Sequence, residues 1–230
     1  MTHPHAAPSP TPDAGNNLHW ADPQRALHFQ HWLAGLPAGL ALDAGSVRLA
    51  SADASFRRYL RVDSARGSLV IMDAPPDKED CKPFVQIDRL MQAAGLRVPE
   101  ILAWEETHGF LLLTDLGAKT MLQSMDLQPP PPLDWYQQAT DALIQWQLAS
   151  KPEVLPAYDK ILLRRELELF PEWYIGRHRN FTLDAPMRKT LDDTFALLIQ
   201  NNLSWPSVYV HRDFMPRNLM VPDLAEIPSK

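Results

Sequence analysis

The first half of the chain carries short hydrophobic runs of the length and composition that form β-strands. Runs of β-branched and large apolar residues, separated by polar segments, predict five strands, at residues 47–50, 59–63, 68–73, 100–105 and 110–114. The first three runs follow one another closely and predict a three-stranded meander. Gly109 lies in the turn between the last two runs, so these two predict a β-hairpin.

Two helices are predicted around these strands by the residues that cap helices. Asp22 followed by Pro23 is typical of a helix N-terminus, and Gly35 marks the end of that helix. A second helix begins at Pro83, between the third and fourth strands, and ends at Gly95. The predicted order is therefore helix, three strands, helix, two strands.

In the second half of the chain, hydrophobic residues recur at helical spacing instead. Four consecutive prolines at residues 129–132 predict a stiff, extended linker. One helix is predicted to start at Asp134, a second to cover residues 161–173, and a third to start at Asp184. The residues expected on the apolar faces of these helices are Trp135, Ala139, Leu143 and Trp146, then Leu163, Leu167, Phe170 and Trp173, then Leu191, Phe195 and Leu198.

This order of elements predicts an α+β protein in which a β-rich region gives way to a helical region near residue 116. We expect residues 18–115 to form the first lobe and residues 116–230 to form the second. Residues 1–17 are rich in Pro, Ala, Ser, Thr and Asn. They have few apolar side chains to offset the entropy of ordering, so we expect a disordered tail.

Composition narrows the class of protein. The chain has 230 residues, of which 45% are hydrophobic, which is enough to build a sizeable core. The net charge of −6 argues against nucleic acid or an anionic membrane as the main partner. Cys81 is the only cysteine, so no intramolecular disulfide forms, and no export signal or bilayer-length apolar run is evident. We expect a cytoplasmic globular protein.

His211, Asp213 and Asn218 have the spacing of the catalytic loop in protein-kinase-like enzymes. Phosphoryl transfer needs a carboxylate that orients the attacking hydroxyl and accepts its proton, and an oxygen ligand for the metal that bridges the phosphates. Asp213 suits the first role and Asn218 the second, with His211 as part of the same catalytic loop. Residues 208–210 and 219–221 predict short strands on either side of this loop.

Four separated segments together resemble the aminoglycoside-phosphotransferase-like sugar kinases. The likeness runs from about Leu27 to Val221 and is carried by residues 53–59, 72–76, 111–117 and 211–220. The resemblance implies a protein-kinase-like fold of two lobes, with a small β-rich, nucleotide-binding N-lobe and a mostly helical C-lobe. It also implies ATP and Mg²⁺ as cofactors. The implied acceptor is the anomeric hydroxyl of an amino sugar, N-acetylmuramate or N-acetylglucosamine, in peptidoglycan recycling.

By this resemblance the turn at residues 53–58 lies over the nucleotide phosphates, although it contains no glycine. Ser55 would offer a hydroxyl or a backbone N–H, and Arg57 or Arg58 would supply positive charge. A surface hairpin with solvated arginines is the alternative. The hinge residues expected to read the adenine edge are Thr114, Asp115 and Leu116, for which a plain strand end is the alternative.

The third strand departs from the protein-kinase pattern, because Met72 stands where those enzymes place the lysine that pairs with the phosphates. Arg58 is a candidate substitute. The helix after Pro83 offers no convincing acidic partner either, since Asp88 is expected to be solvated.

For the acceptor, residues 164–174 combine carboxylates, arginines and aromatic rings suited to a polyol with an acidic group. The candidate substrate-binding residues are Arg165, Glu172 and Trp173. A solvated amphipathic helix explains this segment as well.

Kinases of this class hold their metal with a second carboxylate, in a motif resembling Asp-Phe-Gln-Asp shortly after the catalytic-loop Asn. The sequence reaches Lys230 without this motif, and Asp223 lies too close to Asn218 and lacks the following aromatic residue. We therefore expect this chain to be inactive as it stands, through a premature stop, a frameshift or a deliberate fragment. Two other functions stay open: a non-catalytic nucleotide-binding protein, and a kinase for another small acceptor such as an aminoglycoside, choline or homoserine.

Overall fold

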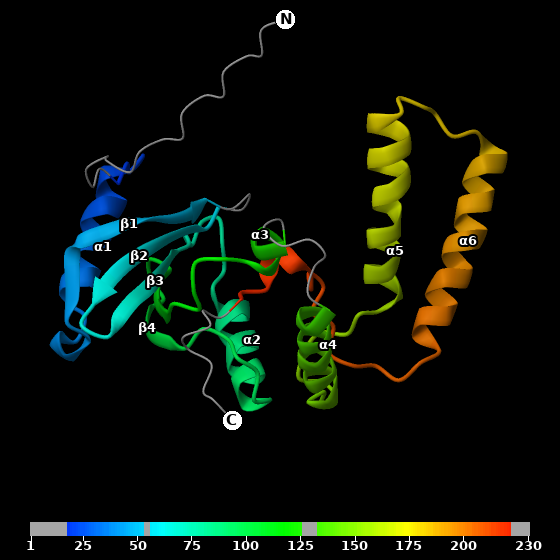
Figure 1. The fold of residues 1–230 in the computed structure, drawn as a ribbon. Helices are drawn as coiled ribbons and strands as arrows, with labels where there is room; N and C mark the ends of the chain where they lie inside the picture. The colour runs from blue at the N-terminus through cyan, green and yellow to red at the C-terminus, as the bar shows by residue number, and fades with distance from the viewer. Residues whose placement is uncertain (1–17, 53–55, 126–132, 222–230) are drawn as a thin grey trace, which may run out of the picture. The chain divides into compact units, whose positions relative to one another are not determined.

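The computed structural model describes residues 18–52, 56–125 and 133–221 (Figure 1). The chain divides into two compact units, one comprising Met1–Pro131 with Pro216–Lys230 and the other Pro132–Met215. These divisions differ from the lobe boundary predicted near residue 116, and the lobe assignment stays a prediction. The tail predicted at residues 1–17 lies outside the described residues.

The first unit contains an antiparallel five-stranded sheet in the order β1-β2-β3-β5-β4 (Figure 1). The strands are β1 Leu42–Ala52, β2 Arg58–Ser64, β3 Gly67–Asp73, β4 Ile101–Glu105 and β5 Phe110–Thr114, which confirms all five predicted strands. Only β1 begins well before its predicted start. Its first residues pair irregularly with β2, with a register shift between Asp43 and Arg48. The first residues of β1 have low strand propensity, and they are extended because they pair with β2.

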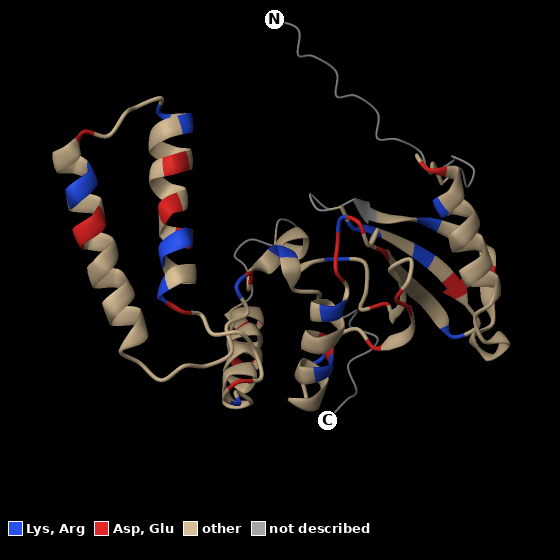
Figure 2. Cartoon of the chain, turned by 180° about the vertical axis from the view of Figure 1, so that it is seen from behind, with Lys and Arg blue, Asp and Glu red and all other residues tan. Residues whose placement is uncertain are grey.

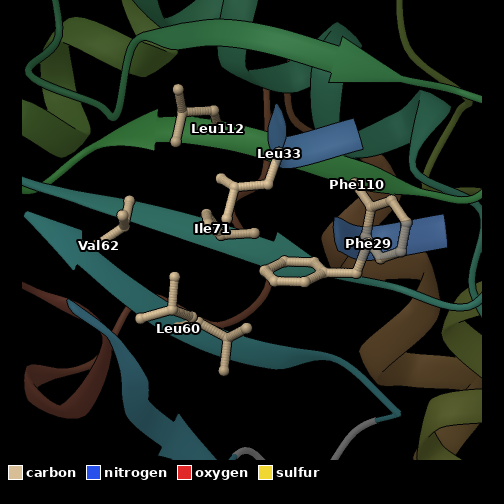
Figure 3. Packing of buried hydrophobic residues seen from close by; sticks show 8 residues of the cluster. Phe29, Leu33, Leu60, Val62, Ile71, Phe110 and Leu112 are labelled. Atoms are coloured by element: carbon tan, nitrogen blue, oxygen red, sulfur yellow. The ribbon is translucent and has the colours of Figure 1, made fainter. Parts of the chain in front are cut away.

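One face of the sheet is covered by α1, Pro23–Ala34. The helix begins as predicted, because the side chain of Asp22 accepts a hydrogen bond from the N–H of Gln24 at 2.9 Å. A short 3₁₀ helix, η1, follows at Ala38–Leu40. Figure 3 shows the resulting core, in which α1 packs against alternate residues of β2, β3 and β5; the labelled residues are Phe29, Leu33, Leu60, Val62, Ile71, Phe110 and Leu112.

The opposite face carries the intervening residues and packs against α2, Lys82–Ala93. Met72, Leu111 and Leu113 from the strands meet Cys81 and Val85 here, and all five are buried. Strand alternation thus gives the sheet two buried faces. The layer between the sheet and α2 is formed mainly by apolar side chains.

The β4–β5 turn requires a glycine. Gly109 has a φ of +72°, and a Cβ added there would lie 2.0 Å from the carbonyl oxygen of Ala74. The N–H of Ala74 donates to the carbonyl of Gly109 at 3.0 Å. The turn therefore fixes the end of β3 against the hairpin, at the point where the chain leaves for α2.

The second unit is helical. Its helices are α4 Leu133–Leu148, α5 Lys160–Leu169, the π-helix η2 Phe170–His178 and α6 Ala185–Leu203. Two further short helices belong to the first unit: α3 Met121–Met125 and the 3₁₀ helix η3 Pro216–Asn218. Asp184 caps α6 as predicted, accepting from the N–H of Met187 at 2.8 Å. No helix formed by the described residues is both long and apolar enough to span a bilayer.

Two of the predicted apolar helical faces are only partly buried. On α6 the buried residues are Phe195 and Ile199, whereas Leu198 is 45% exposed. Phe195 and Ile199 are four residues apart and so lie on the same side of the helix, which is the side that is buried. The helix predicted for residues 161–173 leaves α-helical geometry at Phe170, and Phe170 and Trp173 are about half exposed. Pro171 follows directly and has no N–H for an α-helical hydrogen bond, which favours the wider π-helix.

The strand predicted at residues 208–210 is absent, because no described segment pairs with it. Tyr209 is nevertheless buried, its ring lies 4.7 Å from that of Trp146, and its N–H donates to Ser150 Oγ at 2.7 Å. The segment that leads into the predicted catalytic loop is therefore anchored by a ring contact and a side-chain hydrogen bond.

Candidate active site

The candidate catalytic loop follows Tyr209 in the second unit. The ring of His211 lies edge-on to that of Phe214, with 5.2 Å between their centroids. Burial lowers the pKa of His211 below its usual value, although the nearby Asp213 carboxylate opposes this shift. The imidazole is thus neutral near pH 7 and shapes the loop, whereas the side chain of Asp213 is exposed.

The backbone of this loop is strained at Arg212, which has a φ of +71° although it is not a glycine. Its guanidinium pairs with Glu166 of α5 at 3.1 Å and lies over the ring of Tyr158 at 5.8 Å. Contacts outside the loop therefore hold an unfavourable conformation directly before Asp213. Strain of this kind is concentrated at functional sites.

Asn218 ends η3 in the first unit and is exposed. The residues after it pair with the chain around α3: the N–H of Met121 donates to Leu219 O at 2.7 Å, and that of Val221 donates to Lys119 O at 3.1 Å. The strand predicted at 219–221 is therefore reduced to a single antiparallel bridge, between Thr120 and Met220. This pairing fixes the backbone next to Asn218.

The predicted phosphate turn is described only in part, because Ser55 lies outside the described residues. Arg57 pairs with Glu79, which lies between β3 and α2, at 3.3 Å. Its guanidinium is also 6.0 Å from the ring centre of Phe84 in α2. Arg57 therefore lies on the α2 face of the sheet.

Arg58 lies on the opposite face, in an ion-pair cluster that the sequence did not suggest. Its Nε donates to Asp73 Oδ2 at 3.0 Å, and the guanidinium stacks on Trp20 at 3.9 Å. Arg25 of α1 donates to the other oxygen of Asp73 at 2.8 Å and to the carbonyl of His108 at 2.9 Å. In this structure the charge of Arg58 is engaged by Asp73, and its predicted phosphate contact stays a prediction.

The predicted hinge follows β5. Thr114 Oγ1 accepts from the N–H of Glu100 at 2.8 Å and so closes the β4–β5 pair. Among the described residues, neither the N–H nor the C=O of Leu116 forms a backbone–backbone hydrogen bond in the loops and turns. These backbone groups are of the kind that read an adenine edge.

The carboxylate of Asp115 accepts hydrogen bonds from three residues around the predicted hinge. Arg61 donates to its carboxylate at 2.7 Å, Ser68 at 2.7 Å and the N–H of Gly117 at 3.0 Å. Burial alone would raise the pKa of Asp115, but these hydrogen bonds together hold it below its usual value. The sequence analysis does not identify Arg61 as part of the hinge. The signal that could have identified it is a charged residue between Leu60 and Val62, which are both buried.

Asp88 of α2 is buried, which corrects the expectation that it is solvated. The α2 face that packs on the sheet includes this residue. Gln92 donates to Oδ2 at 2.9 Å, whereas Oδ1 is buried without a hydrogen-bond partner among the described residues. Burial raises the pKa of Asp88 to about 6, and the charge of Arg89 only partly offsets that effect.

Replacing Asp88 with asparagine is expected to stabilise the first unit at neutral pH. The folded-state pKa of about 6 lies above the ordinary 3.8, so the folded chain binds more protons between these values and loses stability as the pH rises through them. The variant should unfold at a higher denaturant concentration at about pH 7, with a flatter pH dependence. Asp77→Asn, at an exposed residue, is the control; equal pH profiles for the Asp88→Asn variant and the parent chain would contradict the assignment.

The candidate acceptor segment lies on α5 and η2. Arg165 is exposed and 3.6 Å from Glu166. Glu172 pairs with Arg177 at 2.9 Å, and the guanidinium of Arg177 stacks on Trp173 at 3.9 Å. The π-helix therefore presents an exposed aromatic ring with a carboxylate and a cation next to it. The role of these side chains in binding a substrate stays a prediction.

Both α5 and α6 carry basic and acidic residues (Figure 2). Glu168 accepts from Arg164 at 2.7 Å and from Arg188 at 2.9 Å, and Asp192 pairs with both arginines. Hydrogen bonds from Arg188 and Arg164 lower the pKa of Glu168. This four-residue network connects the helix that carries Arg165 to its neighbour.

The described residues contain no group of three or more His, Cys, Asp or Glu side chains arranged to hold a metal ion. Mg²⁺ in phosphoryl-transfer enzymes takes few protein ligands and completes its shell with phosphate oxygens and water. An amide oxygen on a fixed turn, as at Asn218, fits that requirement. The roles of Arg57 and of the Leu116 backbone in nucleotide binding stay predictions.

Comparison with known proteins shows which family the chain belongs to. The sequence pattern of the phosphotransferase enzyme family matches residues 46–226. The chain is 49% identical over 172 residues to an N-acetylmuramate/N-acetylglucosamine kinase of Pseudomonas aeruginosa, covering 75% of this chain and 50% of the relative. It is 49% identical over 177 residues to the enzyme of the same name from Pseudomonas putida, covering 77% of this chain and 52% of the relative.

A relative of the same name from Neisseria meningitidis is 36% identical and covers 86% of this chain and 59% of the relative. The chain thus spans about half the length of the curated relatives it matches. The crystal structure of a choline/ethanolamine kinase family protein from Mesorhizobium loti superposes with a TM-score of 0.54 at 16% identity, covering 86% of this chain and 64% of that chain. This likeness confirms the predicted α+β, kinase-like fold.

Proposed function

Because the chain belongs to the phosphotransferase enzyme family, we propose that it acts as an ATP-dependent amino-sugar kinase. The substrate is N-acetylmuramate or N-acetylglucosamine, phosphorylated at the anomeric hydroxyl in peptidoglycan recycling. The observation that carries the proposal is the 49% identity to two kinases named for these sugars. A cytoplasmic location is part of the same proposal.

In this function Asp213 orients the sugar hydroxyl and accepts its proton during transfer. His211 is neutral and packs against Phe214, while the Arg212–Glu166 pair holds the strained backbone beside Asp213. Asn218 supplies an oxygen ligand for Mg²⁺. When bound, Mg²⁺ neutralises the charge that develops on the phosphate oxygens.

The nucleotide is held by the first unit. The backbone of Leu116 binds the adenine edge, with Asp115 and Thr114 shaping the hinge, and Arg57 provides positive charge for the phosphates. For the acceptor, Trp173 offers a ring on which the apolar face of a sugar stacks. Glu172 and Arg165 are the proposed partners for its hydroxyl and acidic groups.

The decisive experiment measures ADP release with a panel of acceptors, with and without Mg²⁺. It uses this chain and an extended protein, defined as a chimera that joins this chain to the part of the Pseudomonas putida relative that the chain does not cover. Mg²⁺-dependent turnover with N-acetylmuramate or N-acetylglucosamine is expected of the extended protein, and we expect none of this chain alone. Transfer only to an aminoglycoside, choline or homoserine, or ATP binding without transfer in the extended protein, would overturn the proposed function.

Replacing Asn218 with alanine in the extended protein is expected to raise the Mg²⁺ concentration needed for half-maximal rate by at least about tenfold, because polar groups at metal sites contribute on this scale. A titration of the rate with Mg²⁺ at saturating sugar measures this shift. Asn202→Ala, at an exposed position of α6, serves as the control. An unchanged Mg²⁺ titration would remove Asn218 from the metal site.

A further inference from the structure

We propose that Arg57 binds the nucleotide phosphates and that Glu79 is its positioning residue. Together they replace the ion pair that protein kinases form between a lysine of the third strand and a glutamate of the next helix. Neither the sequence pattern nor the comparisons suggest a role for Glu79. The inference rests on the proposed function, since it concerns how the chain would hold ATP.

The third strand cannot supply this cation. Met72 is fully buried in the apolar layer beneath α2, so its thioether carries no charge toward a nucleotide. Its partner across the β2–β3 pair is Tyr59, whose ring packs on the same layer. Arg57 directly precedes β2, two residues before Tyr59, and its contacts with Glu79 and Phe84 place its guanidinium on that same face.

The two arginines within β2 pair with different carboxylates. Arg58 is bound to Asp73 on the α1 face, and Arg61 is bound to Asp115 at the hinge end of the α2 face. Arg57 therefore provides positive charge at the end of the α2 face nearest the phosphate turn. Its charge also counteracts the effect of burial on Cys81, the residue before α2: burial raises the pKa of that thiol and Arg57 lowers it.

Glu79 is placed to hold this charge in position. It lies in the turn between β3 and α2, where its N–H donates to Pro75 O at 2.9 Å. The side chains of Arg57 and Glu79 are 27% and 20% exposed, at 3.3 Å. The pair is thus partly shielded from water and keeps an exposed edge. A guanidinium has five N–H donors in a rigid fork, so it can bind Glu79 and phosphate oxygens at once.

The test compares the affinities of this chain for ATP and for adenosine by calorimetric titration. Arg57→Ala is expected to weaken ATP binding by about tenfold or more while changing adenosine affinity by less than about twofold, because only ATP presents phosphates. Glu79→Gln should weaken ATP binding by a smaller factor with the same selectivity, and Glu79→Asp should restore part of the loss. Arg48→Ala, which breaks the exposed Arg48–Asp63 pair on the same sheet, is the matched control and should leave both affinities unchanged.

The outcomes separate this inference from the proposed function. Equal losses for ATP and adenosine, or ATP affinity unchanged in Arg57→Ala, would overturn the inference while leaving the kinase assignment in place. If Arg57→Ala fails to fold in a thermal melt, Arg57→Lys and Glu79→Gln decide the question by the same ATP-to-adenosine comparison. A parent chain that binds neither ligand would overturn the nucleotide site itself, and this inference with it.

Discussion

Replacing Asp213 with asparagine in the extended protein is expected to lower the rate of phosphoryl transfer by about 10²–10⁴-fold, the range that a positioned general base contributes. Asparagine has nearly the same shape but cannot accept the proton of the sugar hydroxyl. The side chain is exposed, so the substitution leaves no buried group unsatisfied. The fold and the ATP affinity should therefore change little, since the lost interaction acts in the transition state.

Single-turnover kinetics with N-acetylmuramate measure this effect separately from product release. A titration with ATP supplies the binding affinity of the same variant. Asp193→Asn, at an exposed residue of α6, is the matched control and should turn over normally. An Asp213→Asn enzyme with near-normal turnover would exclude Asp213 as the base.

Replacing Asp73 with alanine is expected to have the largest effect on stability, reducing the free energy of unfolding of the first unit by about 3–5 kcal/mol. The Asp73 side chain is only 3% exposed and binds Arg25 and Arg58, whose side chains are 15% and 25% exposed. Its removal leaves two partly buried guanidinium groups without their carboxylate. It also releases the contact that joins α1 to β2 and β3.

Chemical denaturation monitored by tryptophan fluorescence measures this loss. The control is Asp63→Ala, which removes an aspartate paired with Arg48 on the same sheet, where both side chains are about half exposed. An exposed pair contributes at most about 1 kcal/mol, so the control should unfold almost like the parent chain. Similar losses for the two variants would show that the Asp73 cluster is not a buried structural ion pair.

Much of the fold follows from local patterns. The five strands and the starts of α1 and α6 were predicted because strand alternation and a capping aspartate act over a few residues. The spacing of the catalytic loop is also a local pattern, and together with three other segments it indicated the correct family. What these residues do in catalysis stays a prediction.

Other features were misjudged because local patterns do not show which side of an element is covered. Asp88 reads as an ordinary polar residue of an amphipathic helix, and it is buried because α2 packs on the sheet through that side. On α6, helical spacing allows both Leu198 and Ile199 to face a neighbour, and only Ile199 is buried. In both cases the choice depends on packing partners that are distant in the sequence.

By itself the sequence determined the kinase-like order of strands and helices, and the chemistry available in the loop from His211 to Asn218. Only the tertiary structure decided which charges meet. Arg25 lies 48 residues before Asp73, and Arg61 lies 54 residues before Asp115. Strand and helix periods depend on neighbouring residues, whereas an ion pair across the sheet depends on how distant segments pack, and one sequence pattern allows many such pairings.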